Sequence, residues 1–377
     1  MTGKEKVLVT GGAGFIGSHT VRQLLAAGYA VRALDNLSPP VHEGNHEWPS
    51  WLPDEVERLE GDVRRPEDWA AALEGVDFVI HLAAYQDLLP DFSKFFSVNA
   101  TGTALLYETI VARKLPVRKV LIASSQFVYG EGQGLCAAHG EVSLPGRNPD
   151  ALEKGLWEPV CPLCGGPVET QPLRENHAAP NNQYAISKYS QELTAIAIGR
   201  NYGIPSVALR YSIVQGPHQS FRNAYSGVMR VFTLQLLNGQ RPTVFEDGSQ
   251  KRDFVNVTDV AGANLLVLKN PEADYQVFNV GGGKAWTVVD FARLAAEVTG
   301  RKIEPRITGE YRVGDTRHSF SDISKIQRLG WQPSKTVRES IEEYSSWITS
   351  QRLEIDYVGE ALRNLRTSGI LKRPSPV

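Results

Sequence analysis

The sequence predicts an α/β protein with a doubly wound parallel sheet and a smaller, discontinuous α/β domain. Two observations support this fold class. Apolar segments of strand length alternate with segments of helical periodicity over the first 212 residues, which is typical of right-handed βαβ units. The first of these strands, at residues 6–10, runs directly into a glycine-rich turn. With 377 residues, the chain can bury one large core or two moderate ones.

The glycine-rich turn spans residues 11–17 and predicts a dinucleotide-binding site of the Rossmann type. Gly11 permits the tight bend from strand to helix, Gly14 lets the backbone approach a pyrophosphate, and Gly17 lets the helix pack closely on the sheet. A purely structural turn is the alternative. The helical spacing of the apolar residues that follow, up to Gly28, favours cofactor binding.

A second strand, at residues 29–34, ends in Asp35. A carboxylate at this distance from Gly17 binds the two hydroxyls of a ribose and repels a 2′-phosphate, so NAD is favoured over NADP. The stretch at residues 36–53 is rich in proline and tryptophan and lacks periodicity. It is therefore expected to be a loop, and its two histidines are expected to be solvated.

Two further strands are expected, the first ending before Asp62 and the second before Ala83 and Ala84. Asp62 is placed to meet the adenine edge of a cofactor, and the two alanines let the cofactor lie against the backbone. The next helix holds Asn99. Two interpretations of this residue stay open: a buried amide that fixes the active-site strand, or an amide on the helix surface.

The candidate catalytic residues are Tyr184 and Lys188, one helical turn apart, and Ser125. A lysine cation beside a tyrosine favours the phenolate, so Lys188 is expected to lower the pKa of Tyr184 and activate it as a base. By itself, this spacing more often marks two exposed helix residues. Here, however, the strand at residues 119–125 ends in hydroxyl groups at the edge where open α/β sheets place their chemistry. Ser125 is therefore expected to join the pair.

An insertion at about residues 131–180 separates the expected serine and tyrosine and holds all three cysteines of the chain. It contains two potential ligand pairs at the spacing with which each pair grips one tetrahedral ion, which predicts a zinc site. Three unremarkable thiols, or a redox pair formed by the two later cysteines, are the alternatives. Four protein ligands leave no position for water, so the zinc is expected to be structural. The expected ligands are Cys136, His139, Cys161 and Cys164, with His177 as the reserve fourth ligand.

The composition gives no reason to expect nucleic acid or a membrane surface as a partner, because the formal net charge is −2. No apolar run approaches the roughly 20 residues that span a bilayer, and the first six residues lack the apolar core of a signal peptide. A cytoplasmic location is therefore expected. Three cysteines are also too few for a disulfide framework in a chain of this length.

These motifs resemble those of the extended short-chain dehydrogenase/reductases that act on nucleotide sugars. The resemblance covers almost the whole chain and also includes residues 81–84, 209–211 and 252–255, in the order found in that family. Within the family, residues 219–227 and 245–252 are most similar to the sugar 4-epimerases.

The resemblance implies contacts with the cofactor and with a nucleotide-sugar substrate. The implied cofactor-binding residues are Gly11, Gly14, Phe15, Ile16, Gly17, Asp35, Asn36, Asp62, Val63, Leu82, Ala83, Ala84, Asn99, Tyr184, Lys188 and Tyr211. The implied substrate-binding residues are Gln86, Gln126, Ser212, Asn223, Arg252, Arg312 and Asp315. The arginines are assigned to the diphosphate, because planar guanidinium groups suit phosphate oxygens, and the aspartate to the nucleotide ribose.

The chain also departs from relatives of this kind. Gln126 and Phe127 stand where similar sugar 4,6-dehydratases carry an aspartic acid and a glutamate. An amide and a phenyl ring cannot do that acid–base work, so dehydration is not expected, and UDP-glucuronate decarboxylation also loses its usual glutamate. Ile213, Gln215 and Asn256 replace other residues usual in the family, which leaves the pose of the substrate open.

The expected function is NAD-dependent epimerisation at C4 of a dTDP- or UDP-linked hexose or 6-deoxyhexose, through a transient 4-keto sugar. A 4-ketoreductase or dehydrogenase is one alternative, and an NAD-binding scaffold with a relic site is another. The resemblance also implies a homodimer with a four-helix seam. The helix at residues 95–112 and the helix after Tyr184 are candidates for that seam, and packing within one chain is an equally open interpretation.

The expected cofactor domain comprises residues 1–212 with about 253–270, and its sheet is expected to end with the strand before Ser212. The expected substrate domain comprises residues 213–252 and 271–350. The remaining residues, 351–377, form a basic, partly helical tail to which the sequence assigns no role.

Overall fold

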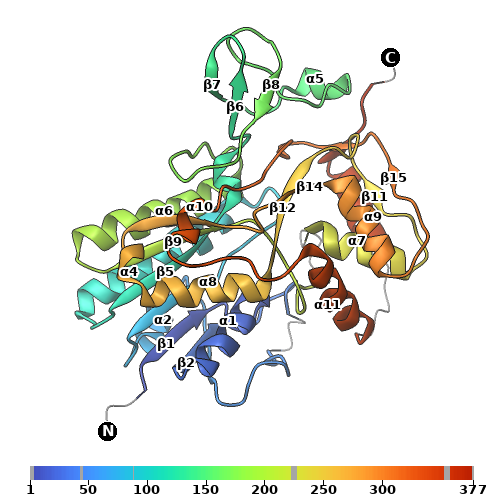
Figure 1. Ribbon diagram of the computed structural model, residues 1–377. Helices are drawn as coiled ribbons and strands as arrows, with labels where there is room; N and C mark the ends of the chain where they lie inside the picture. Colours follow the sequence, from blue (N-terminus) through green and yellow to red (C-terminus); the bar gives the residue numbers. More distant parts are fainter. Residues whose placement is uncertain (1–3, 43–45, 88, 222–226, 352–356, 376–377) are drawn as a thin grey trace.

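The computed structural model describes residues 4–42, 46–87, 89–221, 227–351 and 357–375. Its centre is a seven-stranded parallel sheet with the strand order β13-β9-β5-β4-β1-β2-β3 (Figure 1). The strands are β1 Lys6–Thr10, β2 Ala30–Asp35, β3 Glu57–Glu60, β4 Phe78–His81, β5 Lys119–Ser125, β9 Ser206–Tyr211 and β13 Gln276–Val280. The predicted doubly wound sheet is confirmed.

Helices cover both faces of this sheet, because successive side chains of each strand point to opposite sides. Val7 and Val9 join a core with the helices α1 and α8, whereas Leu8 joins a separate core with α2, α4 and α6. The helices of these layers are α1 Phe15–Ala26, α2 Pro66–Ala72, α4 Gly102–Arg113, α6 Gln183–Asn201 and α8 Val257–Lys269. Two short segments, α3 Phe92–Phe95 and the π-helix η1 Phe96–Thr101, precede α4.

The edge strand β13 corrects the expected domain boundary. The sequence analysis ended the sheet at β9 and assigned residues 271–350 to the substrate domain, but β13 pairs in parallel with β9. Helix α8 packs beside α1 and returns the chain, through η3 (Pro271–Ala273), to the edge of the sheet. This last crossover places β13 in the cofactor domain.

The second region is assembled from separated segments around a third core, as expected. Its main sheet has the order β10-β12-β14, and two-stranded pairs form between β11 and β15 and between β16 and β17. Within the described residues, no helix is long and apolar enough to cross a membrane. The elements are β10 Ile213–Gln215, α7 Gly227–Leu237, β11 Thr243–Val244, β12 Lys251–Asn256, β14 Ala285–Thr287, α9 Val288–Val298, β15 Arg306–Ile307, β16 Tyr311–Arg312, α11 Val337–Thr349, α12 Tyr357–Thr367 and β17 Leu371–Lys372. The short helix α10 Ser324–Gln327 instead packs against β13 and joins the core of the central sheet.

The insertion follows the turn η2 (Gln126–Tyr129) and projects from the body of the molecule (Figure 1). It forms a three-stranded antiparallel sheet of β6 (Gln133–Cys136), β7 (Gly140–Ser143) and β8 (Val168–Thr170), with helix α5 (Pro149–Glu153) beside it. Its apolar core is very small and contains two of the three cysteines.

Candidate active site

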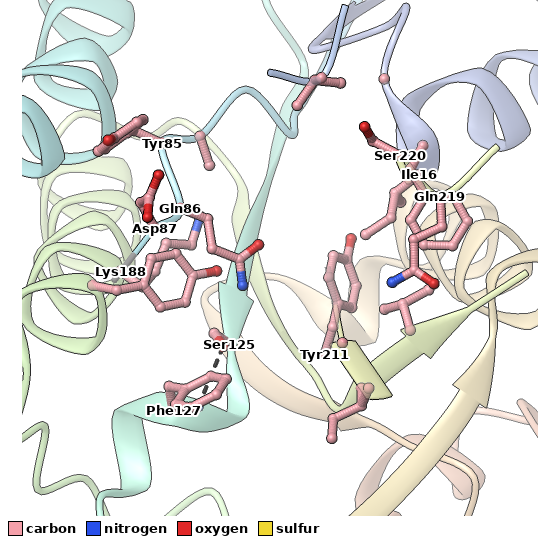
Figure 2. Close-up of a pocket in the computed structure, with 18 of the residues that line it drawn as sticks. Ile16, Tyr85, Gln86, Asp87, Ser125, Phe127, Lys188, Tyr211, Gln219 and Ser220 are labelled. Carbon is pink, nitrogen blue, oxygen red and sulfur yellow. Dashed lines mark hydrogen bonds between the residues drawn. The ribbon is translucent and has the colours of Figure 1, made fainter. Parts of the chain in front are cut away.

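A cavity of about 1110 Å³ lies at the carboxyl ends of the central strands and extends to the second region. Figure 2 shows Ser125, Phe127 and Lys188 on one side of this cavity, with Tyr211 and Ile16 across from them. The glycine-rich turn lines one part of the cavity, and Arg252 and residues 312–315 line another. One continuous space is thus available for a dinucleotide and a second ligand.

The turn after β1 has the close backbone approaches that the sequence predicted. Gly11 has a positive φ of +67°, and a Cβ atom there would lie 2.9 Å from the backbone nitrogen of Ala83. A Cβ atom on Gly17 would lie 2.0 Å from the carbonyl oxygen of Gly11. Every residue implied in cofactor binding lines the cavity, with the exception of Asn99.

Asn99 is fully buried in the π-helical turn η1, so the interpretation as a surface amide is wrong. Its Nδ2 donates to the carbonyl oxygen of Tyr85 at 3.0 Å and to Oγ of Ser187 at 2.9 Å, and its Oδ1 accepts from the Tyr85 backbone N–H at 2.8 Å. Ser187 belongs to the helix that carries Tyr184. Asn99 therefore holds the helix that carries Tyr184, and its side chain does not line the cavity as its assignment as a cofactor contact predicted.

Asp35 lies at the end of β2, where it accepts hydrogen bonds from the backbone N–H groups of Ala13 and Leu37 at 3.1 and 3.0 Å. Burial raises the pKa of its carboxyl group, and His42 opposes that shift from 3.6 Å away. The expectation that the loop histidines are solvated is wrong for His42, which lines the cavity, and holds for His46. The attraction of His42 to the buried carboxylate was not visible in the loop sequence.

The three expected catalytic residues meet at one wall of the cavity. The ring of Phe127 lies 5.9 Å from the Tyr184 ring. Burial raises the pKa of the Tyr184 phenol to about 12, although the hydroxyl group of Ser125 lowers it, and burial lowers the pKa of Lys188 to about 7. The expectation that Lys188 lowers the pKa of Tyr184 is therefore wrong in this structure, because burial disfavours the charged form of both groups.

Lys188 is held by a buried network that sequence reasoning missed. Its ammonium group donates to Oε1 of Gln191, whose Nε2 donates to Thr103 Oγ1 at 2.6 Å. The same threonine lies 3.1 Å from Nε2 of His81, and Nδ1 of His81 lies 2.6 Å from Thr10. In the sequence, only the position of Gln191, one helical turn after Lys188, indicated this network. The network ties Lys188 to β1 and β4.

The buried lysine makes the stability of cofactor-free protein depend on pH. Because the pKa of Lys188 is about 7 when folded and near 10.4 when unfolded, the unfolded chain binds more protons between these values. The free-energy cost of burying the ammonium group is greatest below pH 7, where the folded protein keeps this proton. It falls as the pH rises and the buried group loses its charge. The free energy of unfolding of wild type, relative to Lys188→Met, is therefore expected to rise by at most about 1.4 kcal/mol per pH unit. Urea unfolding of dinucleotide-stripped protein from pH 7 to 9.5 measures this, and a constant difference would contradict it.

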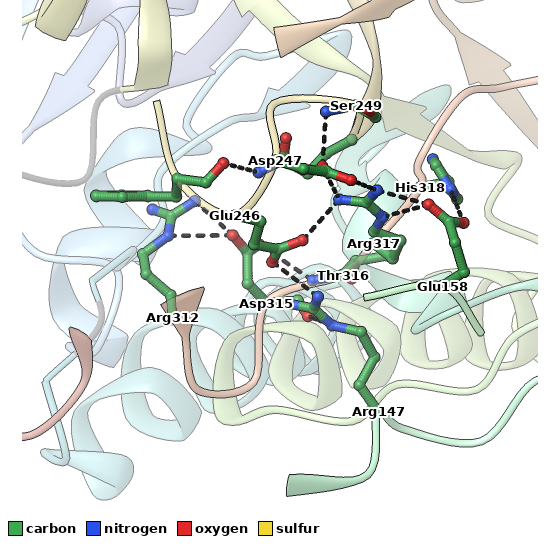
Figure 3. Close-up of polar contacts among 12 residues, drawn as sticks. Arg147, Glu158, Glu246, Asp247, Ser249, Arg312, Asp315, Thr316, Arg317 and His318 are labelled. Atoms are coloured by element: carbon green, nitrogen blue, oxygen red, sulfur yellow. Dashed lines mark hydrogen bonds and ion pairs between the residues drawn. The ribbon is translucent and has the colours of Figure 1, made fainter. Parts of the chain in front are cut away.

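The other end of the cavity carries the expected diphosphate-binding residues. Arg312 Nη2 lies 2.7 Å from Oδ2 of Asp315 (Figure 3). Arg252 Nη2 lies 3.6 Å from the other carboxylate oxygen. Burial opposes ionisation of Asp315, but Arg312, Arg252 and Arg147 outweigh it and lower the pKa of this carboxyl group to about 2. Arg252 also donates to the carbonyl oxygens of Thr316 and Arg317. The cluster is thus a fixed set of charges.

The remaining expected substrate residues differ in what their side chains already bind. Gln86 lines the cavity and is exposed. Gln126 accepts a hydrogen bond from Ser319 at 3.0 Å, and Ser212 donates to Asp253 at 2.7 Å, so both are held within the protein. Asn223 lies outside the described residues. Tyr211 presents its ring to the cavity, because its hydroxyl group donates to Asn264 at 2.6 Å.

The C-terminal tail forms part of the cavity wall, although its sequence suggested no role. Strand β17 pairs with β16, the strand that carries Arg312, and Arg366 and Arg373 bind the buried Glu310 at 3.0 and 3.1 Å. The tail residues at the cavity are mostly apolar: Val358, Ala361, Leu362, Leu365, Gly369 and Ile370. Only the tertiary structure brings this segment to the site.

Deletion of residues 357–377 is expected to raise KM for the expected nucleotide-sugar substrate by about tenfold, because it removes an apolar wall and frees β16. The value of kcat is expected to change little, because Tyr184 and Ser125 lie on other elements. Initial-rate kinetics measure both constants. An unchanged KM would show that the tail does not contact the bound substrate.

The insertion brings together the four expected metal ligands, and their ligand atoms all lie within 4.8 Å of one another. The sulfur atoms of Cys136 and Cys164 are 3.8 Å apart, and Nδ1 of His139 lies 3.7 Å from Cys136 Sγ and 3.6 Å from Cys161 Sγ. All three cysteines are free thiols. A tetrahedral zinc ion with bonds of about 2.3 Å separates its sulfur ligands by about 3.8 Å, so these distances fit such an ion. His177 is not part of the cluster.

Known proteins resemble the chain over nearly its full length. A dTDP-L-rhamnose 4-epimerase from Burkholderia thailandensis is 34% identical and matches 92% of this chain and 96% of its own length. This agrees with the resemblance to dTDP-L-rhamnose 4-epimerases carried by residues 219–227 and 245–252. A putative UDP-glucose 4-epimerase from Methanocaldococcus jannaschii is 32% identical over 91% of this chain and 98% of its own.

Two solved structures have the same fold. A UDP-N-acetylglucosamine 4-epimerase from Methanobrevibacter ruminantium has a TM-score of 0.74 and 30% identity, covering 93% of this chain and 100% of its own. A UDP-glucose 4-epimerase from Thermus thermophilus, solved with NAD, has a TM-score of 0.73 and 29% identity, covering 92% and 100%. Residues 7–154 and 162–281 match the description of one family, and the chain therefore belongs to the NAD-dependent epimerase/dehydratase family.

Proposed function

We propose that the protein is an NAD-dependent nucleotide-sugar 4-epimerase that acts on a dTDP- or UDP-linked hexose or 6-deoxyhexose. One observation carries the proposal: Ser125, Tyr184 and Lys188 share a single cavity with the glycine-rich turn and with Arg252 and Arg312. A dinucleotide and a sugar diphosphate therefore have room to meet at the hydroxyl pair. The names of the similar proteins support the same reaction.

The residues of the first region fit NAD. Gly11 and Gly17 leave no space for a side chain where the dinucleotide turn bends, and Asp35 offers a carboxylate at the end of β2. When bound, NAD supplies the hydride acceptor and a positive charge that favours an ionised phenol. The carboxylate of Asp35 favours NAD over NADP, because it repels a 2′-phosphate.

Tyr184 and Ser125 handle the proton in this proposal. The phenol oxygen of Tyr184 takes the proton of the C4 hydroxyl group, and Oγ of Ser125 hydrogen-bonds the same substrate oxygen as its charge changes. Lys188, held by Gln191, contributes a positive charge near this point when it is protonated. The 4-keto sugar then presents its other face within the large cavity, and Tyr184 returns the proton.

Arg252 and Arg312 would hold the diphosphate and Asp315 the nucleotide ribose, because the guanidinium groups line the cavity beside that carboxylate. Two other functions are compatible with the same site. One is a 4-ketoreductase or dehydrogenase that exchanges its cofactor at each turnover, and the other is an NAD-binding scaffold without activity. Dehydration is disfavoured, because Gln126 and Phe127 offer no acid or base at the catalytic wall.

Incubation of purified protein with dTDP-, UDP- and GDP-sugars and no added cofactor tests the proposal. Interconversion of C4 epimers without net NADH is expected, because hydride returns to the same sugar. A strict need for added NADPH, or accumulating NADH, would favour the reductase or dehydrogenase. No turnover of any sugar would favour the scaffold.

We also infer that Cys136, His139, Cys161 and Cys164 hold a structural zinc ion. The convergence of all four ligand atoms, at spacings that suit tetrahedral coordination, supports zinc over unremarkable thiols. A redox pair of Cys161 and Cys164 would not explain why Cys136 and His139 lie in the same cluster. The very small apolar core of the insertion further supports a metal, since little else stabilises the module.

A homodimer through α4 and α6 is proposed as well. The two helices pack on each other within the chain, yet Ile186 and Leu193 of α6 remain 41% and 52% exposed on one face. Such a face suits a second copy of the chain. Sedimentation velocity tests this assembly, and a monomer would contradict it. A cytoplasmic location stays a prediction.

A further inference from the structure

Two charged side chains of the insertion reach out of it and contact residues 315–318, which follow the strand at the diphosphate end of the cavity. They are Arg147 and Glu158, and both lie in the stretch that leaves the Cys/His cluster after His139 and returns to it at Cys161. The four cluster residues therefore fix both ends of the segment that carries these charges. The proposed epimerisation chemistry uses neither residue.

Arg147 contacts the backbone and a partner of the diphosphate-binding cluster. Its Nε donates to the carbonyl oxygen of Asp315 at 2.9 Å, and its Nη1 lies 2.7 Å from Oε1 of Glu246 (Figure 3). The side chains of Arg147 and Glu246 are 5% and 3% exposed. Charged groups this deeply buried depend on each other, because removal of one leaves the other without compensation.

Glu158 contacts the residues that follow Asp315 and Thr316 in the chain. Its Oε1 accepts from Nε and Nη2 of Arg317 at 2.9 and 2.5 Å, and its Oε2 lies 2.9 Å from Nε2 of His318. Arg317 is completely buried and also binds Glu246 at 2.8 Å. The insertion thus grips residues 315–318 at two points (Figure 3).

Residues 315–318 in turn orient the arginines of the cavity. The carbonyl oxygens of Thr316 and Arg317 accept hydrogen bonds from Arg252 at 2.8 and 2.9 Å, and the carboxylate of Asp315 binds Arg312. A shift of this segment would move both guanidinium groups together. None of these hydrogen bonds involves the glycine-rich turn, so we expect the dinucleotide end of the cavity to depend little on this segment.

We propose that Arg147 and Glu158 are positioning residues that couple metal binding in the insertion to binding of a nucleoside diphosphate at Arg252 and Arg312. The inference rests on the proposed zinc site and on the diphosphate end of the proposed substrate site. Coupling of two binding sites is reciprocal, so zinc strengthens nucleotide binding by the same factor by which the nucleotide strengthens zinc binding.

Calorimetric titration of the full chain with UDP and with dTDP tests the proposal. Arg147→Met is expected to weaken binding of the preferred nucleotide by about tenfold and to leave the affinity for NAD unchanged. Arg174→Met is the matched control, because Arg174 lies in the same insertion but its side chain is 54% exposed and pairs with Asp322 at 3.7 Å. Glu158→Gln, at a side chain that is 61% exposed, provides a milder second variant with a loss in the same direction.

Removal of zinc by a chelator is expected to weaken nucleotide binding of wild type and to add little in the Arg147→Met background, because both changes release the same segment. Unchanged nucleotide affinity in Arg147→Met and Glu158→Gln, an equal loss of NAD affinity, or a wild type that binds neither nucleotide would overturn the proposal. These titrations need no turnover. A protein that binds UDP or dTDP as described but epimerises no sugar would refute the proposed function alone.

Discussion

Turnover by the Tyr184→Phe variant is expected to fall by up to about 10⁴-fold, because the change removes the only oxygen assigned to take the C4 hydroxyl proton. The fold should stay intact, since the phenol is buried and its ring remains in place beside Phe127. Epimer interconversion under substrate saturation measures the loss. Titrations with NAD and a nucleoside diphosphate serve as the control and should match wild type.

Ser125→Ala provides the graded comparison. Loss of one hydrogen-bond donor at a developing charge costs about 10²–10³ in rate, so measurable activity should remain. The alanine variant also loses the hydroxyl group that lowers the pKa of the Tyr184 phenol in wild type. A Tyr184→Phe variant with wild-type rates would show that another group is the base.

The paired substitution Cys161→Ser and Cys164→Ser is expected to abolish zinc binding and to unfold the insertion locally. Structural zinc contributes about 10–16 kcal/mol in small zinc-binding peptides, whereas the apolar core of this module consists of a handful of residues. Metal analysis of untagged wild type should give about one zinc per chain. Limited proteolysis should show new cleavage within residues 131–180 of the variant.

His177→Asn is the control for this experiment, because His177 lies outside the ligand cluster and should not affect the zinc content. Loss of zinc in that variant would instead restore His177 as the fourth ligand. Metal-free wild type with full stability would remove the zinc proposal, and a Cys161–Cys164 disulfide in that protein would favour the redox alternative.

The sequence by itself determined the features that depend on neighbouring residues. The glycine spacing of the turn after β1 and the one-turn separation of Tyr184 and Lys188 follow from local backbone geometry. The two ligand pairs of the insertion were recognisable for the same reason. The alternation of strands and helices likewise indicated the parallel sheet, because crossovers between parallel strands have few solutions.

The tertiary structure alone decided how distant segments combine. Cys136 and Cys164 are 28 positions apart and Arg147 and Glu246 are 99 apart, so the chain path rather than spacing places them in contact. The same holds for β13 and for the tail beside Arg312. The pKa of Tyr184 shows most clearly what residue spacing alone does not predict. Spacing predicted a lowered value, but desolvation depends on everything packed around the phenol, and burial raises the pKa to about 12.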